Sequence, residues 1–368
     1  MHAIATTADT ATELAGWLRL QHVPGVGPVA ARALLGRFGL PPHIFSAPFD
    51  ALREVVPASV ARLIAQPPRP VANSQLELTL QWLQRPGNAV LSLADAAYPP
   101  LLLEIADPPL LLYVRGRAEL LSRPGVAIVG SRNASAQGMQ NAAAFAHALS
   151  GAGVTIISGL ALGIDTHAHE GGLRGAGGTV AVIGTGADLV YPRRNLDLAQ
   201  RIAEQGCIVS EYALGLPAMP ANFPRRNRLI SGLARGVLVI EAAAQSGSLI
   251  TARLAGEQGR DVYALPGSIH ATLAKGCHAL IKQGAKLVES ADDVLQELSW
   301  LGMPAARPDD AAPVDTPLLA VLGHDPHDAD TLAARSGLAM GVLMGELLAL
   351  ELAGRVERLP GGLFQRCK

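Results

Sequence analysis

The feature that most constrains the fold is a regular alternation in the middle of the chain. Six short runs are rich in β-branched residues and apolar on both faces, and stretches of helical length separate them. The runs cover residues 126–129, 155–157, 179–183, 208–209, 237–240 and 261–265. Such strands are typical of a parallel sheet that helices cover on both sides. Residues 98–300 are therefore predicted to form a doubly wound α/β domain, with ligands at the carboxyl ends of the strands.

A helical pattern broken by Pro-Gly and Pro-Pro turns precedes this domain, and residues 1–85 are predicted to form a small all-α domain. Gly25 and Gly27 lie in a Gly-apolar-Gly turn between two of its helices. The turn resembles a helix-hairpin-helix of the SAM-like all-α class, whose free amides bind DNA phosphates weakly and without regard to sequence. The alternative is a tight turn within a helical bundle, because the turn itself contains no lysine or arginine.

A linker and a compact C-terminal domain follow. The composition of residues 301–316 is typical of a linker. Residues 317–368 are predicted to form three helices and a short hairpin, which is the pattern of a winged helix. The third of these helices, residues 340–352, contains no lysine or arginine and includes Glu346 and Glu351. This composition favours packing or protein contact over the reading of DNA bases.

The amino-acid composition and net charge limit the classes of protein to which the chain can belong. A chain of 368 residues with 49% hydrophobic residues can bury two or three cores. It shows neither a signal-peptide pattern nor a long apolar segment, and its three cysteines are isolated. A cytoplasmic protein without disulfides is expected. Because the net charge is −1, any binding of nucleic acid must depend on a local cluster of cations.

Four of the predicted strands end in glycine-rich turns. Turns of this kind leave backbone N–H groups free at the start of a helix, where an anion is stabilised. Together they are predicted to form one phosphate-binding crevice. The candidate residues in these turns are Gly130, Ser131, Arg132, Ser158, Gly159, Gly163, Gly184, Gly186, Ser246, Gly247 and Ser248.

Arginines follow the same strands. Arg132 comes directly after the first strand and Arg193 and Arg194 come after the third, while the run 223–228 precedes the fifth. That run contains Phe223, Arg225, Arg226, Asn227 and Arg228. As a set, six arginines at one edge of a sheet favour a site for an anionic polymer. Packing of a helix is the alternative explanation for Arg228, and Arg132 is the strongest candidate for a phosphate contact.

Aromatic residues can add base stacking beside these cations. Tyr191, Tyr212 and Phe223 are predicted to lie beside the crevice, although core packing explains Tyr212 equally well. An aromatic content of 4% argues against an extended stacking platform.

The sequence argues against nucleotide hydrolysis, NAD chemistry and a metal site. The sequence contains neither G-x-x-x-x-G-K-[ST] nor G-x-G-x-x-G, which argues against ATP hydrolysis and NAD chemistry. His167 and His169 are two residues apart on a predicted helix and point to different sides, so a cap by Asp165 with partly buried histidines is favoured over a metal site. Glu211 and Glu241 follow strands, but neither has a paired nucleophile in the sequence. Neither a metal nor a cofactor is predicted.

Taken together, these motifs resemble those of the DNA-processing protein A family (DprA, also called Smf). The likeness covers residues 98–298 and includes Ile-Val-Gly-Ser-Arg at 128–132 and Ser-Gly-Leu-Ala-Leu-Gly-Ile-Asp at 158–165. Further matching segments are residues 191–195, 210–212, 223–228, 246–251, 265–267 and 275–285. The order and spacing of so many motifs make the resemblance specific.

The resemblance implies an extended Rossmann-like domain that binds single-stranded DNA, dimerises, and loads the RecA recombinase onto it. It implies a non-enzymatic role in natural transformation and recombination, in which incoming DNA is protected. By position, Arg132 is implied to bind phosphate, and Arg193 is implied to be the basic residue after Tyr-Pro. Cys277 and His278 stand where some members have an asparagine, which leaves the role of that position open.

Two other functions remain open. Similar glycine-rich crevices occur in nucleotide phosphoribohydrolases, in which case the chain would be an enzyme with Glu241 as acid or base. In a third interpretation, the α/β domain is a dimerising scaffold and only the hairpin at Gly25 and Gly27 contacts DNA.

Overall fold

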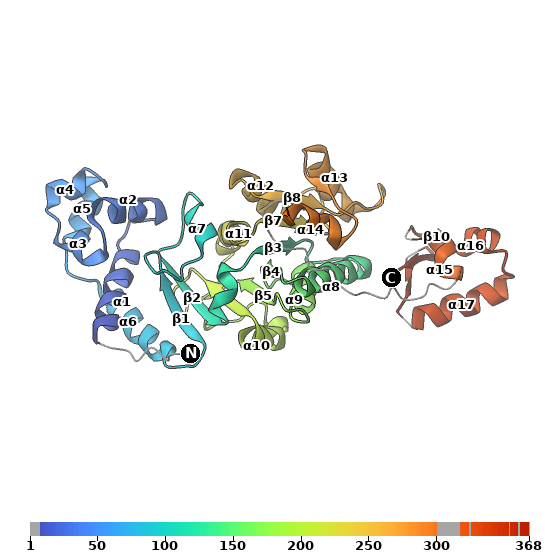
Figure 1. The fold of residues 1–368 in the computed structure, drawn as a ribbon, viewed down its shortest axis with the longest axis horizontal. Helices are drawn as coiled ribbons and strands as arrows, with labels where there is room; N and C mark the ends of the chain where they lie inside the picture. Colours follow the sequence, from blue (N-terminus) through green and yellow to red (C-terminus); the bar gives the residue numbers. More distant parts are fainter. Residues whose placement is uncertain (1–7, 300–316, 324, 353, 360, 368) are drawn as a thin grey trace.

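The computed structural model of the chain describes residues 8–299, 317–323, 325–352, 354–359 and 361–367 (Figure 1). The predicted linker, residues 301–316, lies outside the described residues. Six N-terminal helices lie beside a large central sheet, and a smaller group of helices and strands lies at the C-terminal end.

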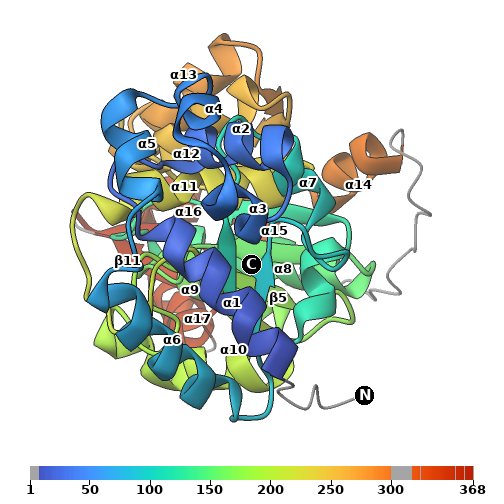
Figure 2. The ribbon, with the colours of Figure 1, turned by 90° about the vertical axis from the view of Figure 1, so that its left-hand side faces the viewer.

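The N-terminal helices begin where the sequence places prolines. Pro28, Pro41 and Pro70 each occupy the first helical position, where the missing N–H has no partner to lose. Trp17 and Leu34 are buried in the shared core. In Figure 2 these helices face the viewer and lie in front of the sheet. They are α1 (Ala8–Gln21), α2 (Pro28–Phe38), α3 (Pro41–Ser46), α4 (Phe49–Arg53), α5 (Ala58–Ile64) and α6 (Pro70–Leu83).

A sheet of nine strands forms the centre, in the order β1-β2-β6-β5-β4-β3-β7-β8-β9. Strands from β6 to β9 along this order pair in parallel, whereas β2 is antiparallel to β6 and β1 to β2. The strands are β1 (Asn88–Ser92), β2 (Leu111–Gly116), β3 (Gly125–Val129), β4 (Thr155–Ser158), β5 (Thr179–Val182), β6 (Cys207–Ser210), β7 (Gly236–Val239), β8 (Asp261–Ala264) and β9 (Lys286–Leu287). The predicted α/β class is confirmed, and all six predicted strands are present.

Helices cover both faces of this sheet, as the apolar strands require. Along β3, Val126 and Ile128 pack in one core with Phe145, while Ala127 and Val129 pack in the other with Leu229. The helices of this domain are α7 (Pro100–Leu103), α8 (Ala136–Gly151), α9 (Ile164–Gly172), α10 (Leu196–Gln205), α11 (Asn222–Leu233), α12 (Ser248–Glu257), α13 (Lys275–Lys282) and α14 (Ala291–Ser299). Short 3₁₀ helices occur at Ala118–Ser122, Arg193–Asn195 and Thr272–Ala274.

The C-terminal residues form the predicted winged-helix arrangement of three helices and a small sheet of order β10-β12-β11. Leu332, Leu343 and Phe364 lie in its core. The elements are α15 (Pro317–Leu322), β10 (His327–Asp328), α16 (Ala329–Ser336), α17 (Met340–Leu352), β11 (Val356–Leu359) and β12 (Leu363–Arg366). Within the described residues no single helix is long and apolar enough to cross a membrane; α16 and α17 meet that test only as a pair bent by 108°.

Candidate nucleic-acid interface

The four glycine-rich turns predicted from the sequence meet at one edge of the sheet. They follow β3, β4, β5 and β7, which are neighbours in the order β5-β4-β3-β7. Because parallel strands end at the same edge, their connections converge there. The structure therefore brings the predicted turns together, but only some of their polar groups are free to bind a ligand.

Hydrogen bonds to two neighbouring segments fix the turn after β3, and this turn exposes one arginine. The Ser131 amide donates to the Glu241 carbonyl at 2.7 Å, and the Ile164 amide donates to the Ser131 carbonyl at 3.2 Å. A Cβ atom on Gly130 would lie 2.6 Å from the Ile164 side chain, so only glycine fits. Arg132 is exposed, and within the described residues it has no hydrogen bond or ion pair. A rigid backbone thus presents a free guanidinium.

Polar groups of the turn after β4 form hydrogen bonds within the protein and are therefore not free for a ligand. The Gly159 amide donates to Asp165 Oδ2 at 3.1 Å, and the buried Ser158 hydroxyl donates to the Ile128 carbonyl at 2.7 Å. The prediction that Ser158 and Gly159 offer these groups to a phosphate is therefore wrong. Gly163, with φ of 75°, packs its Cα against the Ser131 carbonyl and leaves no room for a side chain. The turn supports the neighbouring Ser131–Arg132 segment instead.

Buried polar side chains fix this turn. Leu160 has a positive φ of 57°, which is unfavourable for leucine. Its amide donates to His169 Nε2 at 3.2 Å, and its carbonyl accepts from Asn195 Nδ2 at 3.0 Å. His169 Nδ1 lies 2.8 Å from Thr179 Oγ1, which itself donates to the Ile156 carbonyl, so His169 is neutral and donates to Thr179. These contacts give His169 a structural role, and among the described residues no group of three or more histidine, cysteine, aspartate or glutamate side chains that could hold a metal ion is found.

The buried histidine predicts a pH dependence of stability. Burial, followed by the charge of Arg226, lowers the pKa of His169 from 6.5 to about 3. Between these values the unfolded chain binds a proton that the folded chain does not, so stability falls as the pH falls. We expect a loss of about 1 kcal/mol per pH unit below about pH 6.5. The measurement is urea unfolding of the wild type and His169→Gln at about pH 7 and pH 5.

The glutamine variant is the control, since its amide can accept from Leu160 and donate to Thr179 without titrating. Other ionisable groups contribute equally to both proteins, so the difference between the two slopes isolates the histidine. Identical slopes for the wild type and the variant would contradict the assignment.

Arg226 lies inside the protein rather than on the crevice. It is 4% exposed, and its Nη1 donates to the Val182 carbonyl and, at 2.7 Å, to the Gly159 carbonyl. Burial lowers the pKa of Arg226 to about 10, and the Asp165 carboxyl opposes that shift. The prediction of Arg226 as a phosphate ligand is corrected: its guanidinium ties the β4 turn to the end of β5.

Arg228 is likewise unavailable to a phosphate. It is 5% exposed and forms ion pairs with Glu211 and, at 3.0 Å, with Asp107. Burial raises the pKa of Glu211, and the Arg228 charge opposes that rise. The alternative explanation from the sequence, that Arg228 serves packing, is the one that the structure supports.

The glycines of the turn after β5 are also buried and hydrogen-bonded within the protein. Gly184 and Gly186 are buried, and the Gly186 amide donates to the Leu216 carbonyl at 2.9 Å. The Gly184 carbonyl accepts from Asn222 Nδ2 at 3.0 Å, and Phe223 lies against the Gly184 Cα. Neither glycine is positioned to bind a phosphate as predicted. Both allow the start of α11 to pack closely on the end of β5.

Four arginines of the predicted set remain exposed: Arg132, Arg193, Arg194 and Arg225. We refer to them as the arginine set. Two aromatic rings accompany them, since the rings of Tyr191 and Phe223 lie 5.4 Å apart and Tyr191 is 51% exposed. Tyr212 is buried and donates to the Asn222 carbonyl, which supports its alternative role in packing. Half-buried Asn227 lies on α11 between the two buried arginines.

The turn after β7 contains two serine hydroxyls that lie close together. The Ser246 and Ser248 hydroxyl oxygens lie 2.7 Å apart, and exposed Gly247 lies between them at the start of α12. Ser246 is half-buried and Ser248 is 8% exposed. This turn keeps polar groups at the same edge as Arg132, and these three residues stay in the proposed site.

Two carboxylates that sequence reasoning considered as acid or base are occupied. Glu241 accepts from the Ser135 hydroxyl at 2.6 Å and from the Ser135 amide at 2.9 Å, which anchors the N-cap residue of α8. Glu211 is paired with Arg228. Cys277 is buried in the core, and His278 Nε2 lies 3.0 Å from the Gly267 carbonyl. These contacts give each of the four residues a structural role.

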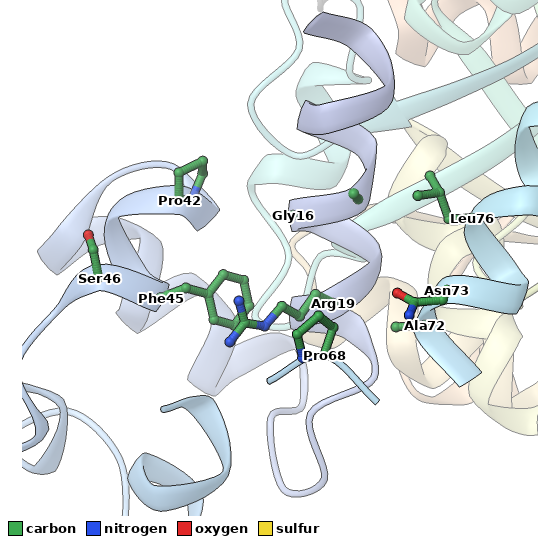
Figure 3. Close-up of a pocket in the computed structure, with 10 residues that line it drawn as sticks. Gly16, Arg19, Pro42, Phe45, Ser46, Pro68, Ala72, Asn73 and Leu76 are labelled. Atoms are coloured by element: carbon green, nitrogen blue, oxygen red, sulfur yellow. The ribbon is translucent and has the colours of Figure 1, made fainter. Parts of the chain in front are cut away.

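Within the described residues, the N-terminal helices line two cavities of about 400 Å³ and about 450 Å³. One, of about 400 Å³, lies among α1, α3 and α6 (Figure 3); there the Arg19 guanidinium lies 3.7 Å from the centre of the Phe45 ring and donates to the Ile64 and Gln66 carbonyls. The other, of about 450 Å³, lies between the Gly25–Gly27 turn and the sheet edge at Arg225. Neither cavity could be predicted from local sequence patterns, because the walls of each come from segments that are separated in the chain.

The chain is similar to two family models and to several known proteins. Residues 89–299 match the family model described as DNA recombination-mediator protein A, and residues 303–362 match a DprA winged helix domain. The Smf protein of Escherichia coli K12 is 44% identical over 300 residues, which cover 78% of this chain and 80% of that protein. The DNA processing protein DprA of Streptococcus pneumoniae is 49% identical over 209 residues, 57% of this chain and 74% of that protein.

Two solved structures share the arrangement. The crystal structure of DprA from Streptococcus pneumoniae aligns with a TM-score of 0.61 and 37% identity, over 79% of this chain and 98% of that chain. A structure of DNA processing protein A from Helicobacter pylori aligns with a TM-score of 0.53 and 30% identity, over 57% of this chain and 96% of that chain. The latter was described for its mode of binding single-stranded DNA.

Proposed function

Because the chain belongs to the DNA recombination-mediator protein A family, we propose that it binds single-stranded DNA along the carboxyl edge of its sheet. The observation that supports this most strongly is the arginine set: Arg132, Arg193, Arg194 and Arg225 are exposed at one edge and make no hydrogen bond or ion pair within the described residues. Guanidinium groups suit phosphate oxygens, and the rigid turns keep the cations in place. The Helicobacter pylori relative, which binds single-stranded DNA, lends further support.

Base contacts distinguish a single strand from a duplex. Tyr191 is exposed beside Phe223 and near Arg193 in the sequence, so an unpaired base can stack on its ring while the phosphates contact the arginine set. A duplex keeps its bases stacked inside and cannot use this ring. Ser131, Ser246, Gly247 and Ser248 add polar groups along the same edge.

We further propose that the protein loads the RecA recombinase onto the strand it holds, protects incoming DNA in natural transformation and recombination, and acts as a homodimer through the Rossmann-like domain. The family description as a recombination mediator supports the first of these roles. We propose binding rather than catalysis, because Glu241 is held by Ser135 and Glu211 by Arg228. This argument weakens the alternative of a nucleotide-hydrolysing enzyme.

The test is fluorescence anisotropy with labelled oligo-dT and a matched duplex over a salt series. Four phosphate contacts predict a log–log slope of about −3 for the single strand, because each contact contributes about −0.7. We expect clearly weaker binding to the duplex. A flat salt dependence, or equal affinity for both forms, would refute the proposed site.

RecA loading requires a separate assay. The rate of ATP hydrolysis by RecA is followed on single-stranded DNA already coated with a single-strand-binding protein. We expect the wild-type chain to shorten the lag and Arg132→Ala to restore most of it. If the chain binds oligo-dT but leaves the lag unchanged, the loading role fails while strand binding stands.

A further inference from the structure

The cavity between the N-terminal helices and the sheet edge is shared by two domains. Its volume is about 450 Å³, and the N-terminal domain contributes Gly25 and Gly27, from the turn before α2. The Rossmann-like domain contributes Tyr212, from the connection after β6, and Arg225, from the first turn of α11. The carboxyl end of β6 lies at the edge that holds the arginine set, so the cavity continues that edge.

The two domains are fixed against each other around this cavity. Leu111, the first residue of β2, is buried in the core of the N-terminal helices. Arg32 on α2 donates to the Ile105 carbonyl at 3.1 Å, and Gln75 on α6 donates to the Leu214 carbonyl at 3.2 Å. In Figure 1, α1 and α2 accordingly lie on the side of the sheet where β2 lies. A ligand therefore meets a cavity that already has its shape, which lowers the cost of binding.

The turn at Gly25 and Gly27 offers free hydrogen-bond donors. Both glycines are exposed, and in the part of the chain that the structure describes neither amide donates a hydrogen bond. Backbone N–H groups of consecutive turn residues bind anions such as phosphate. The turn itself contains no lysine or arginine, so a cation must come from elsewhere if this turn is to bind DNA.

Arg225 of the Rossmann-like domain supplies the cation that the turn lacks. It lines the same cavity, is exposed, and makes no hydrogen bond or ion pair within the described residues. Glu211 also lines the cavity, but its Oε1 is buried and its Oε2 is paired with Arg228. Of the two residues on the walls that carry a full charge, Arg225 is therefore the exposed one. A guanidinium and free amides on one cavity suit a phosphate.

We propose that the cavity binds one nucleotide of the single strand, with its phosphate between Arg225 and the amides of Gly25 and Gly27. Val26 and Leu110 add apolar surface for the sugar and base. Small-molecule pockets usually measure about 300–1,000 Å³, so a cavity of about 450 Å³ is large enough for one nucleotide. This proposal rests on the proposed function and adds the N-terminal domain to the strand-binding site.

The cavity is within reach of a strand held at Arg132. Three strand spacings separate β3, which precedes Arg132, from β6, which precedes the cavity residue Tyr212, and this amounts to about 14 Å. Arg225 lies on α11, whose first residue, Asn222, donates to the Gly184 carbonyl after β5, and β5 lies between these two strands. A short oligonucleotide can therefore contact Arg132 and fill the cavity at the same time.

The test places a carboxylate on the cavity wall at Gly27. Aspartate fits there, because Gly27 is the N-cap of α2, its backbone is extended, and a Cβ atom would meet nothing within 4 Å. Asparagine is an equally good N-cap of the same shape, so Gly27→Asn isolates the effect of charge. In fluorescence anisotropy with oligo-dT, we expect Gly27→Asp to bind about tenfold more weakly than Gly27→Asn, because the carboxylate repels the phosphate.

Gly36 supplies the matched control at the other end of α2. It is exposed, a Cβ atom there would also meet nothing within 4 Å, and it does not line the cavity. We expect Gly36→Asp and Gly36→Asn to bind oligo-dT within about twofold of each other, since salt screens a distant exposed charge. The thermal midpoint of each variant is compared with that of the wild type to confirm folding. Equal affinities of the two Gly27 variants, or an equal difference at Gly36, overturn the proposal.

Arg132→Ala, measured alongside, separates this proposal from the proposed function. If Arg132→Ala weakens binding of oligo-dT and the two Gly27 variants bind alike, only the cavity site fails. If the Gly27 variants differ and Arg132→Ala binds like the wild type, the cavity site stands and the assignment of the strand to Arg132 fails. If the wild type does not bind oligo-dT, both fail.

Discussion

Replacement of Arg226 by alanine is expected to lower the free energy of unfolding by about 3–5 kcal/mol. The guanidinium is buried, it satisfies the Gly159 and Val182 carbonyls, and its charge compensates the buried Asp165 carboxyl. Its removal leaves a buried carboxyl and two carbonyls without their partner. Urea unfolding followed by circular dichroism measures the loss.

The adjacent arginine supplies the matched control. Arg225 is exposed and has no hydrogen bond or ion pair within the described residues, so Arg225→Ala is expected to change stability by no more than about 0.5 kcal/mol. The two variants remove the same group one residue apart. A loss of stability in both, or in neither, would show that the assignment of buried and exposed arginines is incorrect.

Replacement of Arg132 by alanine is expected to weaken binding of oligo-dT by about tenfold or more, since a hydrogen bond to a charged group contributes roughly 1.5–3 kcal/mol. The turn that presents Arg132 is anchored through Ser131 to Glu241 and Ile164, so the side chain can be removed without loss of the turn. The log–log slope against salt should become shallower by about 0.7. Fluorescence anisotropy over a salt series gives both values.

Arg62→Ala is the control for this variant. Arg62 is an exposed arginine on α5, and it does not line the cavity at Arg225. The substitution changes the net charge of the protein by the same amount, so it corrects for the general effect of charge. If both variants weaken binding equally, the contact is a diffuse electrostatic effect and Arg132 is not a specific ligand.

The site combines a buried polar network with a row of exposed cations, and the two serve different purposes. Asp165, His169 and Arg226 use the amides and carbonyls of the β4 turn, which keeps the backbone rigid. Arg132 lies on the turn next to it and stays free. Because the cations are held by a rigid backbone, less conformational entropy is lost when a strand binds.

The sequence by itself determined the α/β class and the six strands, and it predicts that ligands bind at the carboxyl edge of the sheet. Apolar runs such as residues 126–129 are buried on both faces, so they predict strands within a covered sheet. The position of Arg132 after such a run predicts its place at the carboxyl edge. The strands β1 and β2 escaped prediction because they belong to no strand–helix alternation and pair antiparallel.

Only the tertiary structure decided which of the arginines are free. Arg225 and Arg226 are adjacent on α11, and successive residues of a helix point about 100° apart, so the packing of the helix decides which one is buried. That packing depends on β4 and β5, which lie far away in the sequence. The cavity joins Gln21 to Glu211 in the same way, across 190 residues. Local sequence patterns do not record such contacts, because they form only when distant segments fold together.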